Sequence, residues 1–184
     1  MRRMILIAML LLVPMLGHAQ RGADRQTQVE QLRDALQRAP SEEVAVAIEG
    51  RLRRMELEAG TPAVTLLMSR GLRDLAAKSY DDAIEVFSDA IILDPSLAEA
   101  YHQRAIAKFR AGDSVGAVKD LEETLRREPR SFAAWRTLVE IAVARENWKS
   151  AYEACVKLLE MNPKMPGGEE RLKDLKRRAF GQEL

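Results

Sequence analysis

Three prolines, Pro95, Pro129 and Pro163, recur at intervals of 34 residues, and the residues before each of them follow one pattern. A fixed period of about 20–50 residues is the signature of an array in which one supersecondary unit stacks on the next. Aligned on the prolines, the chain gives three segments, 64–97, 98–131 and 132–165. The period predicts an all-α array of three helical hairpins, each closed by a proline that cannot continue a helix.

Within each segment, small residues recur where two helices of a hairpin must approach closely. Positions 8 and 20 hold Gly71, Ala105 and Val139, and Ala83, Ala117 and Ala151. Bulky residues stand beside them at positions 4 and 24: Leu67, Tyr101 and Trp135, and Phe87, Leu121 and Cys155. The residues expected to hold the repeats together are Gly71, Ala83, Phe87, Ala90, Pro95, Ala105, Ala117, Pro129, Trp135, Ala151 and Pro163.

These positions resemble the tetratricopeptide repeat family, whose repeats are small at 8, 20 and 27, bulky at 4, 17 and 24, and Pro at 32. The resemblance covers about 100 of the 184 residues. It implies a right-handed superhelical solenoid of three helix-turn-helix repeats with flanking capping helices. Val139 and Leu158 depart from the small-residue pattern, which predicts looser helix packing in the third repeat.

The resemblance also implies a concave groove lined by the first helix of each hairpin. The corresponding groove residues here are Thr65, Met68, Ser69, Leu72, Glu99, His102, Gln103, Ile106, Arg110, Arg136, Thr137 and Glu140. One end of this set is apolar and the other is polar with mixed charge, which indicates an amphipathic helix or an extended segment as ligand. Family members that clamp the carboxylate of chaperone tails use Lys, Asn and Arg, and those residues are absent from the matching positions.

The first 19 residues have the layout of a secretory signal peptide. Arg2 and Arg3 precede the apolar run 4–16, and small residues flank His18 before the expected cut ahead of Gln20. The run is shorter than the roughly 20 residues that span a bilayer; an uncleaved membrane anchor is the alternative. We expect export to the bacterial periplasm or beyond. Cleavage would remove two of the 29 basic residues and leave 27 against 28 acidic ones, an argument against nucleic-acid binding.

Both flanks of the array read as helical. Residues 20–62 are expected to form a degenerate hairpin that caps the stack: an amphipathic helix over 24–38, a break at Pro40, an N-cap at Ser41 and a second helix ending near Gly60. Inside the array, Gly112 and Asp113 are expected to end one helix and cap the next. Residues 166–184 are expected to form a C-terminal capping helix whose thin apolar stripe contains Leu172 and Leu175.

Residues capable of catalysis are scarce. Cys155, the single cysteine, occupies an interior repeat position and is interpreted as a buried thiol, with a reactive thiol as the alternative. His102 is the one histidine after residue 19, no metal-binding spacing is present, and no nucleophile accompanies it. We therefore expect no enzymatic activity, no cofactor and no metal.

The sequence thus favours a protein-protein interaction module, an envelope scaffold or assembly factor that binds a peptide or helix in its groove. Its partners would be other proteins of the cell envelope, without nucleic acid and with membrane contact only through an uncleaved signal segment. The alternative is a self-associating, homo-oligomeric protein whose groove is occupied by its own N-terminal helix.

Overall fold

The computed structural model describes residues 24–181, and the expected signal peptide lies outside that range. Every regular element within it is a helix. A first helix covers 24–37 and is followed by α2 (Glu42–Leu57), α3 (Pro62–Ala76), α4 (Tyr80–Leu93), α5 (Ala98–Arg110), α6 (Ser114–Arg127), α7 (Phe132–Ala144), α8 (Trp148–Met161) and α9 (Gly168–Phe180). None of the helices described is long and apolar enough to cross a bilayer.

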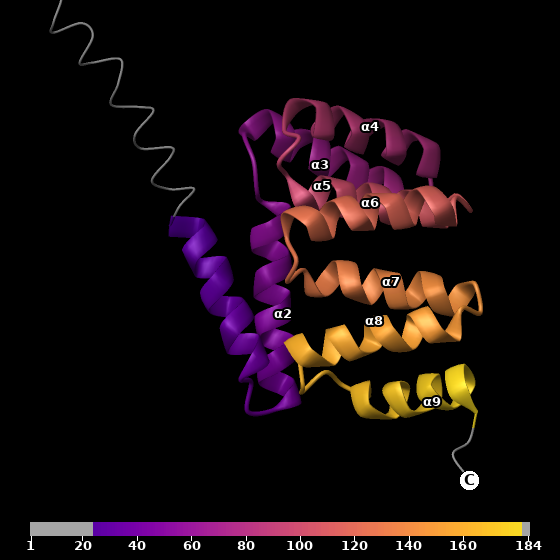
Figure 1. Ribbon diagram of the computed structural model, residues 1–184. Coiled ribbons are helices and arrows are strands. Elements are labelled where there is room, and N and C mark those ends of the chain that lie inside the picture. Colours follow the sequence, from indigo (N-terminus) through magenta and orange to yellow (C-terminus); the bar gives the residue numbers. More distant parts are fainter. Residues whose placement is uncertain (1–23, 182–184) are drawn as a thin grey trace, which may run out of the picture.

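The hairpins α3–α4, α5–α6 and α7–α8 stack in order, and α9 lies on α8 at the end of the stack (Figure 1). Local sequence explains where the helices begin and end. The predicted N-caps are confirmed: Ser41 Oγ accepts a hydrogen bond from Val44 N, and Asp113 Oδ1 accepts one from Gly116 N. Gly112 has a φ of 93°, the positive φ that its place after α5 predicts.

Each repeat ends in the same way. Asp94, Glu128 and Asn162, which precede the three prolines, all lie outside the helical region, with ψ angles of 86°, 81° and 84°, because the proline ring disfavours that region for the residue before it. The carbonyl of the proline then accepts a hydrogen bond from the aromatic side chain at position 4 of the next repeat. Tyr101 Oη lies 3.4 Å from Pro95 O, and Trp135 Nε1 lies 3.2 Å from Pro129 O.

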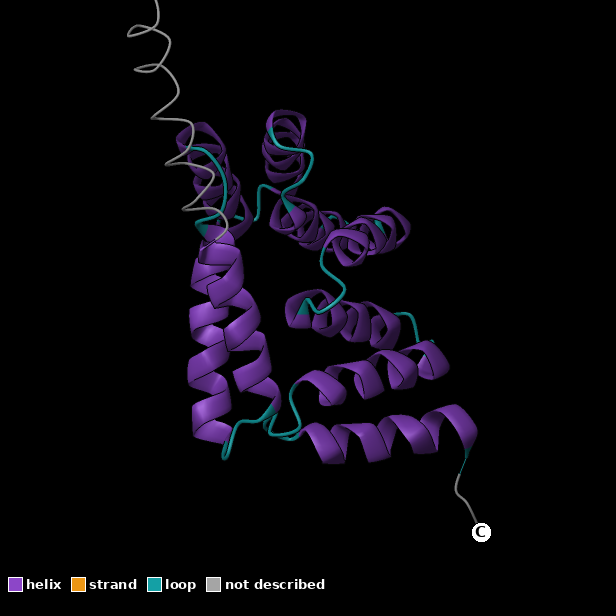
Figure 2. Cartoon of the chain, turned by 60° about the vertical axis from the view of Figure 1, so that its left-hand side comes forward, coloured by secondary structure: helices purple, strands orange, loops and turns teal. Residues whose placement is uncertain are grey.

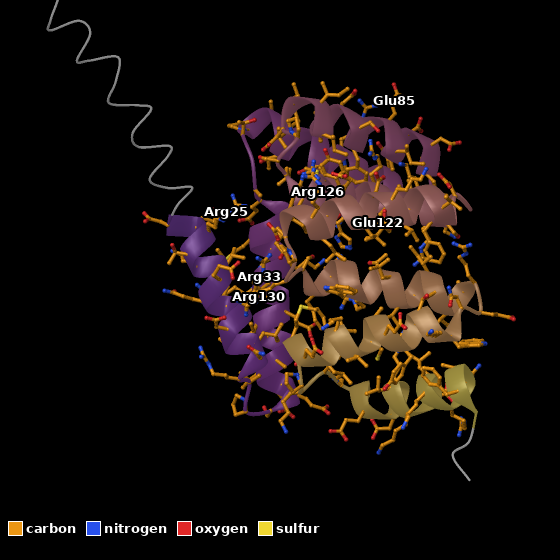
Figure 3. All side chains as sticks on the ribbon, viewed as in Figure 1. Arg25, Arg33, Glu85, Glu122, Arg126 and Arg130 are labelled. Atoms are coloured by element: carbon orange, nitrogen blue, oxygen red, sulfur yellow. The ribbon has the colours of Figure 1, made fainter. Side chains whose placement is uncertain are left out.

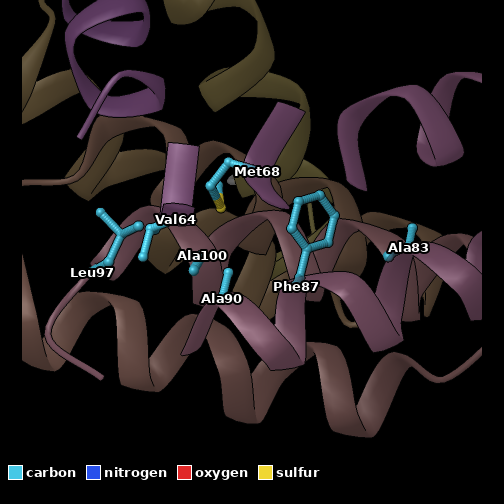
Figure 4. Close-up of a cluster of buried hydrophobic side chains, with 8 residues drawn as sticks. Val64, Met68, Ala83, Phe87, Ala90, Leu97 and Ala100 are labelled. Carbon is cyan, nitrogen blue, oxygen red and sulfur yellow. The ribbon is translucent and has the colours of Figure 1, made fainter. Parts of the chain in front are cut away.

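The small-residue positions lie where the hairpins close. In the first repeat Gly71 packs against the ring of Phe87, and a Cβ added at Gly71 would lie 2.5 Å from that ring. The surrounding cluster includes Val64, Met68, Ala83 and Ala90 (Figure 4). The expected packing alanines Ala83, Ala90, Ala105, Ala117 and Ala151 are all fully buried.

The prediction of looser packing in the third repeat is wrong. Val139 and Leu158 are fully buried, and α7 approaches α8 as closely as α3 approaches α4. Volume is exchanged between the two helices: Val139 is larger than Gly71, but Cys155 stands where the first repeat has Phe87. Leu158 packs instead toward the N-terminal hairpin, in a cluster with Leu36 and Phe132.

The N-terminal hairpin, residues 24–57, does not continue the stack. Figures 1 and 2 show α2 standing across the ends of the repeat helices, with the first helix beside it. The buried side chains of the hairpin form one cluster with the second and third repeats: Val29, Leu36, Ala39, Ala45, Leu52, Phe132 and Leu158. The expectation that the hairpin caps the stack is therefore corrected, because its apolar stripe packs with Phe132 and Leu158 rather than on the outer face of α3.

Candidate binding groove

A cavity of about 460 Å³ lies between α2 and the concave side of α5 and α7. Eight of the twelve predicted groove residues line it: Glu99, His102, Gln103, Ile106, Arg110, Arg136, Thr137 and Glu140. The repeat phase explains the grouping, because successive turns of α5 and α7 place these residues on the same side of both helices. Phe109, Phe132 and Met161 add apolar surface to the same cavity.

The first repeat does not contribute to this cavity. Thr65, Ser69 and Leu72 are partly buried and lie outside the cavity lining. Met68 is 1% exposed and belongs to the core between α3, α4 and α5. Met68 is therefore a packing residue in this structure, and a charge placed there would disrupt the fold rather than test the groove.

The floor of the cavity is a polar network on α5 and α7. Glu99 accepts a hydrogen bond from Gln103 Nε2 at 2.6 Å, and its other oxygen lies 3.2 Å from His102 Nδ1. His102 Nε2 lies 3.1 Å from Thr137 Oγ1. Thr137 Oγ1 also donates to the backbone carbonyl of Ala133 at 3.0 Å, so its lone pairs face the imidazole.

His102 is thus buried with both ring nitrogens engaged. Gln103 is also buried, and its side chain is held to Glu99 through the Nε2 hydrogen bond.

The wall opposite α5 and α7 comes from the N-terminal hairpin, through Arg33, Leu36, Val46, Glu49, Gly50, Leu52, Arg53 and Glu56. The alternative of a groove occupied by the N-terminal helix anticipated that the helix would lie near the groove, but none of these residues was predicted. The hairpin lacks the 34-residue pattern that gave the phase of α5 and α7, so no periodic signal indicated which of its faces would meet the groove.

Polar contacts attach the hairpin to the repeats. The Arg33 guanidinium is 8% exposed and forms ion pairs with Glu56 of α2 and with Glu128 at the end of α6. Arg130 reaches back to the first helix, 3.0 Å from Glu30 and 2.7 Å from Asp34. Glu128 and Arg130 flank Pro129, so these attachments depend on the loop that closes the second repeat.

The third repeat provides the matching attachment. Asn162, fully buried before Pro163, donates a 2.5 Å hydrogen bond from Nδ2 to Glu49 of α2. Asn162 and Glu128 occupy the same repeat position, and both bind the hairpin. The hairpin therefore contacts one row of equivalent residues along the edge of the solenoid.

Two carboxyl groups on α2 carry the electrostatic cost of this arrangement. Burial, together with the nearby charges of Glu99 and Glu128, raises the pKa of Glu56 to about 7 against the attraction of Arg33. Burial also raises the pKa of Glu49, although Asn162 and Arg136 favour its ionised form. The cavity wall thus contains a glutamate that changes charge near neutral pH.

Two cavity arginines have no carboxylate partner in the described part of the chain. Arg53 on α2 and Arg110 at the end of α5 form no ion pair there, and Arg136 reaches Glu49 only at 3.7 Å. Glu140 is the lining glutamate without a cationic partner in the same range. No group of three or more potential metal ligands occurs within residues 24–181.

Comparison with known proteins identifies the repeats. The tetratricopeptide repeat family model matches residues 102–166, which include most of α5 and all of α6, α7 and α8. The second and third repeats are therefore similar to tetratricopeptide repeats. A TPR repeat-containing protein of Rhizobium etli is 26% identical over 153 residues, covering 83% of this chain and 75% of that relative.

Solved structures agree on the fold. The first TPR of Spaghetti (RPAP3), bound to the HSP90 peptide SRMEEVD, has a TM-score of 0.58 and 19% identity, and the match covers 62% of this chain and 90% of that one. The MamA protein has a TM-score of 0.59 and 17% identity over 86% of this chain and 85% of its own. At these identities the likeness establishes the tetratricopeptide-repeat solenoid and no more.

Proposed function

We propose that this protein is a non-catalytic adaptor that holds an extended segment of another protein in the cavity between α2 and α5–α7. The observation that carries the proposal is the cavity itself. It combines a polar floor from Glu99 and Gln103, apolar walls from Ile106 and Phe109, and two arginines, Arg53 and Arg110, that form no ion pair with residues 24–181. The bound HSP90 peptide of the Spaghetti domain supports a peptide ligand for this fold.

The shape of the site favours an extended ligand. The cavity is bounded by the N-terminal hairpin on one side and by α5 and α7 on the other. The hairpin is fixed there by the Arg33–Glu128 ion pair and the Asn162–Glu49 hydrogen bond. An extended segment of a few residues can lie along the cavity and leave these contacts intact.

The charge of the cavity favours an acidic segment. Two arginines of the lining, Arg53 and Arg110, lack carboxylate partners among residues 24–181. Glu140 is the one lining glutamate that lacks a cationic partner in this range. A carboxylate on the ligand would meet a guanidinium at short range in a partly desolvated site, where such pairs discriminate between partners. We expect a segment with one or two acidic side chains beside an apolar one.

We also propose that the adaptor is exported and acts in the bacterial cell envelope. This proposal is based on the apolar run 4–16 and the small residues before Gln20. The partners would then be other envelope proteins, bound by a scaffold or assembly factor. N-terminal sequencing of the chain recovered from the periplasm checks this step: a start at Gln20 supports export, and recovery in the cytoplasm with Met1 retained contradicts it.

The binding proposal is tested by selecting from a display library of random seven-residue segments against the purified protein. We expect enrichment of acidic segments with an apolar residue, and loss of their binding in Ile106→Glu and in Arg110→Glu. Glu122→Lys on the exposed side of α6 is the matched charge control and should bind normally. Binders unaffected by both cavity variants, or no enrichment at all, would contradict the proposal and favour a groove filled by the chain's own hairpin.

A further inference from the structure

No residue of the range 24–181 covers the outer face of the first repeat. In the second and third repeats, positions 3 and 10 of the first helix pack against the preceding hairpin, and Ala100, Ala107, Ala134 and Ile141 there are 0–1% exposed. In α3 the same positions hold Leu66, which is 67% exposed, and Arg73, which is exposed. The N-terminal hairpin leaves this stacking face open because it packs on the second and third repeats.

Repeat position 7 of the first helix also belongs to this stacking face, and in the second repeat it contacts the preceding hairpin. Arg104 of the second repeat donates from Nη1 to Ser88 of the preceding hairpin at 3.1 Å. Its counterpart in α3, Arg70, reaches only Asp74 of its own helix, at 3.8 Å. The open face of α3 is therefore a stripe of Leu66, Arg70 and Arg73 that has the geometry of a repeat-stacking surface.

The neighbouring helix α4 carries a stripe of complementary character. Asp82, Glu85, Asp89 and Ile92 follow one another at helical spacing and are exposed, Ile92 to 74%. Figure 3 shows Glu85 at this free end of the stack. Arg73, Glu85 and Asp89 form no ion pair with any residue of the range 24–181, so no described side chain neutralises their charges.

The antiparallel register of α3 and α4 places the charged residues of the two stripes at matching heights along the helices. Gly71 lies against Phe87, so Arg73 is level with Glu85 and Leu66 is level with Ile92, since α3 and α4 are antiparallel. Arg70 is within one residue of the level of Asp89. A two-fold axis parallel to the helices preserves these heights and places α3 of one copy antiparallel to α4 of another.

We propose that this face pairs two copies of the chain as an antiparallel four-helix bundle of α3 and α4 with their counterparts. In this pairing Leu66 of each copy packs on Ile92 of the other, while Arg70 and Arg73 face Asp89 and Glu85. The cavity is lined by the first helix, α2, α5 and α7 and by residues near them, so both cavities stay open in the dimer. The proposal is independent of what the cavity binds.

The size of the face predicts a weak dimer. Two helices about 21 Å long and about 10 Å wide give a footprint of about 400 Å² per copy and roughly 800 Å² in total, below the 1,200–2,000 Å² of stable interfaces. Much of the face is charged, so we expect micromolar association that weakens as salt is raised.

The test is sedimentation velocity over a concentration series, on protein purified after expression of the whole 184-residue chain. One variant combines Arg70→Glu with Arg73→Glu, and the second combines Glu85→Arg with Asp89→Arg. Each alone places like charges opposite each other at both contacts of the symmetric pair, so the dissociation constant should rise at least tenfold. Mixed in equal amounts, the two variants place opposite charges at both contacts and should form a heterodimer.

Lys119→Glu with Glu122→Arg, on the exposed side of α6, is the control that should leave dimerisation unchanged. Should a charge variant fail to fold by circular dichroism, Leu66→Ser with Ile92→Ser removes the apolar contacts without changing charge and should also give monomers. Three results would overturn the proposal: a monomeric wild-type chain at several hundred micromolar, a dimer insensitive to these variants, or folded variants that stay monomeric when mixed.

Discussion

The two segments that flank the repeats are both helical, yet they are attached by different forces. At the C-terminal end α9 buries Leu175 against α8 and presents a charged surface to solvent. At the N-terminal end the hairpin is held by an apolar cluster together with the buried ion pairs of Arg33 and the Asn162–Glu49 hydrogen bond. The first attachment covers the stack, and the second encloses a cavity.

The difference suggests which flank has a functional role. Apolar burial alone is sufficient to close a solenoid, since a terminal unit needs only one face for the last repeat. Buried charges cost desolvation energy that apolar packing of the same volume would avoid. The hairpin retains such charges where it borders the cavity, which fits a segment shaped for binding as well as for stability.

Weakening the apolar contact between α9 and α8 should cause the largest loss of stability. We expect Leu175→Ala to destabilise the protein by about 2–4 kcal/mol, because Leu175 is 3% exposed and its removal leaves a cavity against α8. Urea unfolding followed by circular dichroism measures this. The exposed Lys173→Ala is the control, and equal midpoints for the two variants would show that α9 does not stabilise the stack.

Removing the Arg33 ion pairs should destabilise the N-terminal hairpin without destabilising the repeats. Arg33→Met keeps the aliphatic stem but leaves Glu56 and Glu128 without their shared cation. The expected cost is below the roughly 3–5 kcal/mol of a fully buried pair, because the Glu128 side chain is 36% exposed. Hydrogen exchange in residues 24–57 should accelerate, while α7 and α8 keep their protection. The exposed Arg38→Met should not alter either region; uniform acceleration in Arg33→Met would mean that the hairpin and repeats unfold together.

The charge of Glu56 should make hairpin docking depend on pH. Its pKa is raised from 4.5 to about 7 in the folded state, so the folded protein holds this proton more tightly than the unfolded chain does. The hairpin therefore loses stability as the pH rises from about 4.5 to 7 and does not recover it above 7.

Glu56→Gln removes this penalty, and we expect hairpin docking to strengthen by roughly 1–3 kcal/mol at pH 8. Hydrogen exchange of α2 at pH 6 and pH 8, corrected for the intrinsic rate, is the measurement. Docking in the variant that is unchanged or weaker at pH 8 would show that the Arg33 ion pair outweighs the burial of Glu56.

The surface charges of α9 should matter least. Asp174 pairs with Arg177 and Arg178 on the exposed side of the helix, and pairs of this kind contribute little in water. Asp174→Asn should leave the melting temperature unchanged within error. A clear decrease would mean that α9, like the hairpin, depends on its charges.

The repeats could be predicted because their packing is encoded at a fixed period. Pro95, Pro129 and Pro163 gave the phase, and the phase correctly identified Gly71 against Phe87 and the buried alanines. The same phase brought Glu99, His102 and Thr137 together on one surface. It failed for Met68, because the groove position of the first repeat is turned into the core between α3 and α5.

The hairpin could not be placed by the same reasoning. Its apolar residues Val29, Leu36 and Leu52 predict helices with a buried stripe, but a stripe does not indicate which surface it covers. The attachment depends on Glu128 and Asn162, two ordinary polar residues before prolines. Only the folded arrangement shows that these residues form one row facing Arg33 and Glu49.

The most direct test of the binding cavity is photo-crosslinking in living cells from a photoreactive amino acid at position 106, beside a matched probe at position 122 on the opposite surface. The structure predicts that position 106 crosslinks to an extended, acidic segment of another protein and that position 122 does not. Crosslinks from position 106 only to the chain's own α2, or identical partners from both positions, would contradict a cavity that receives an external ligand.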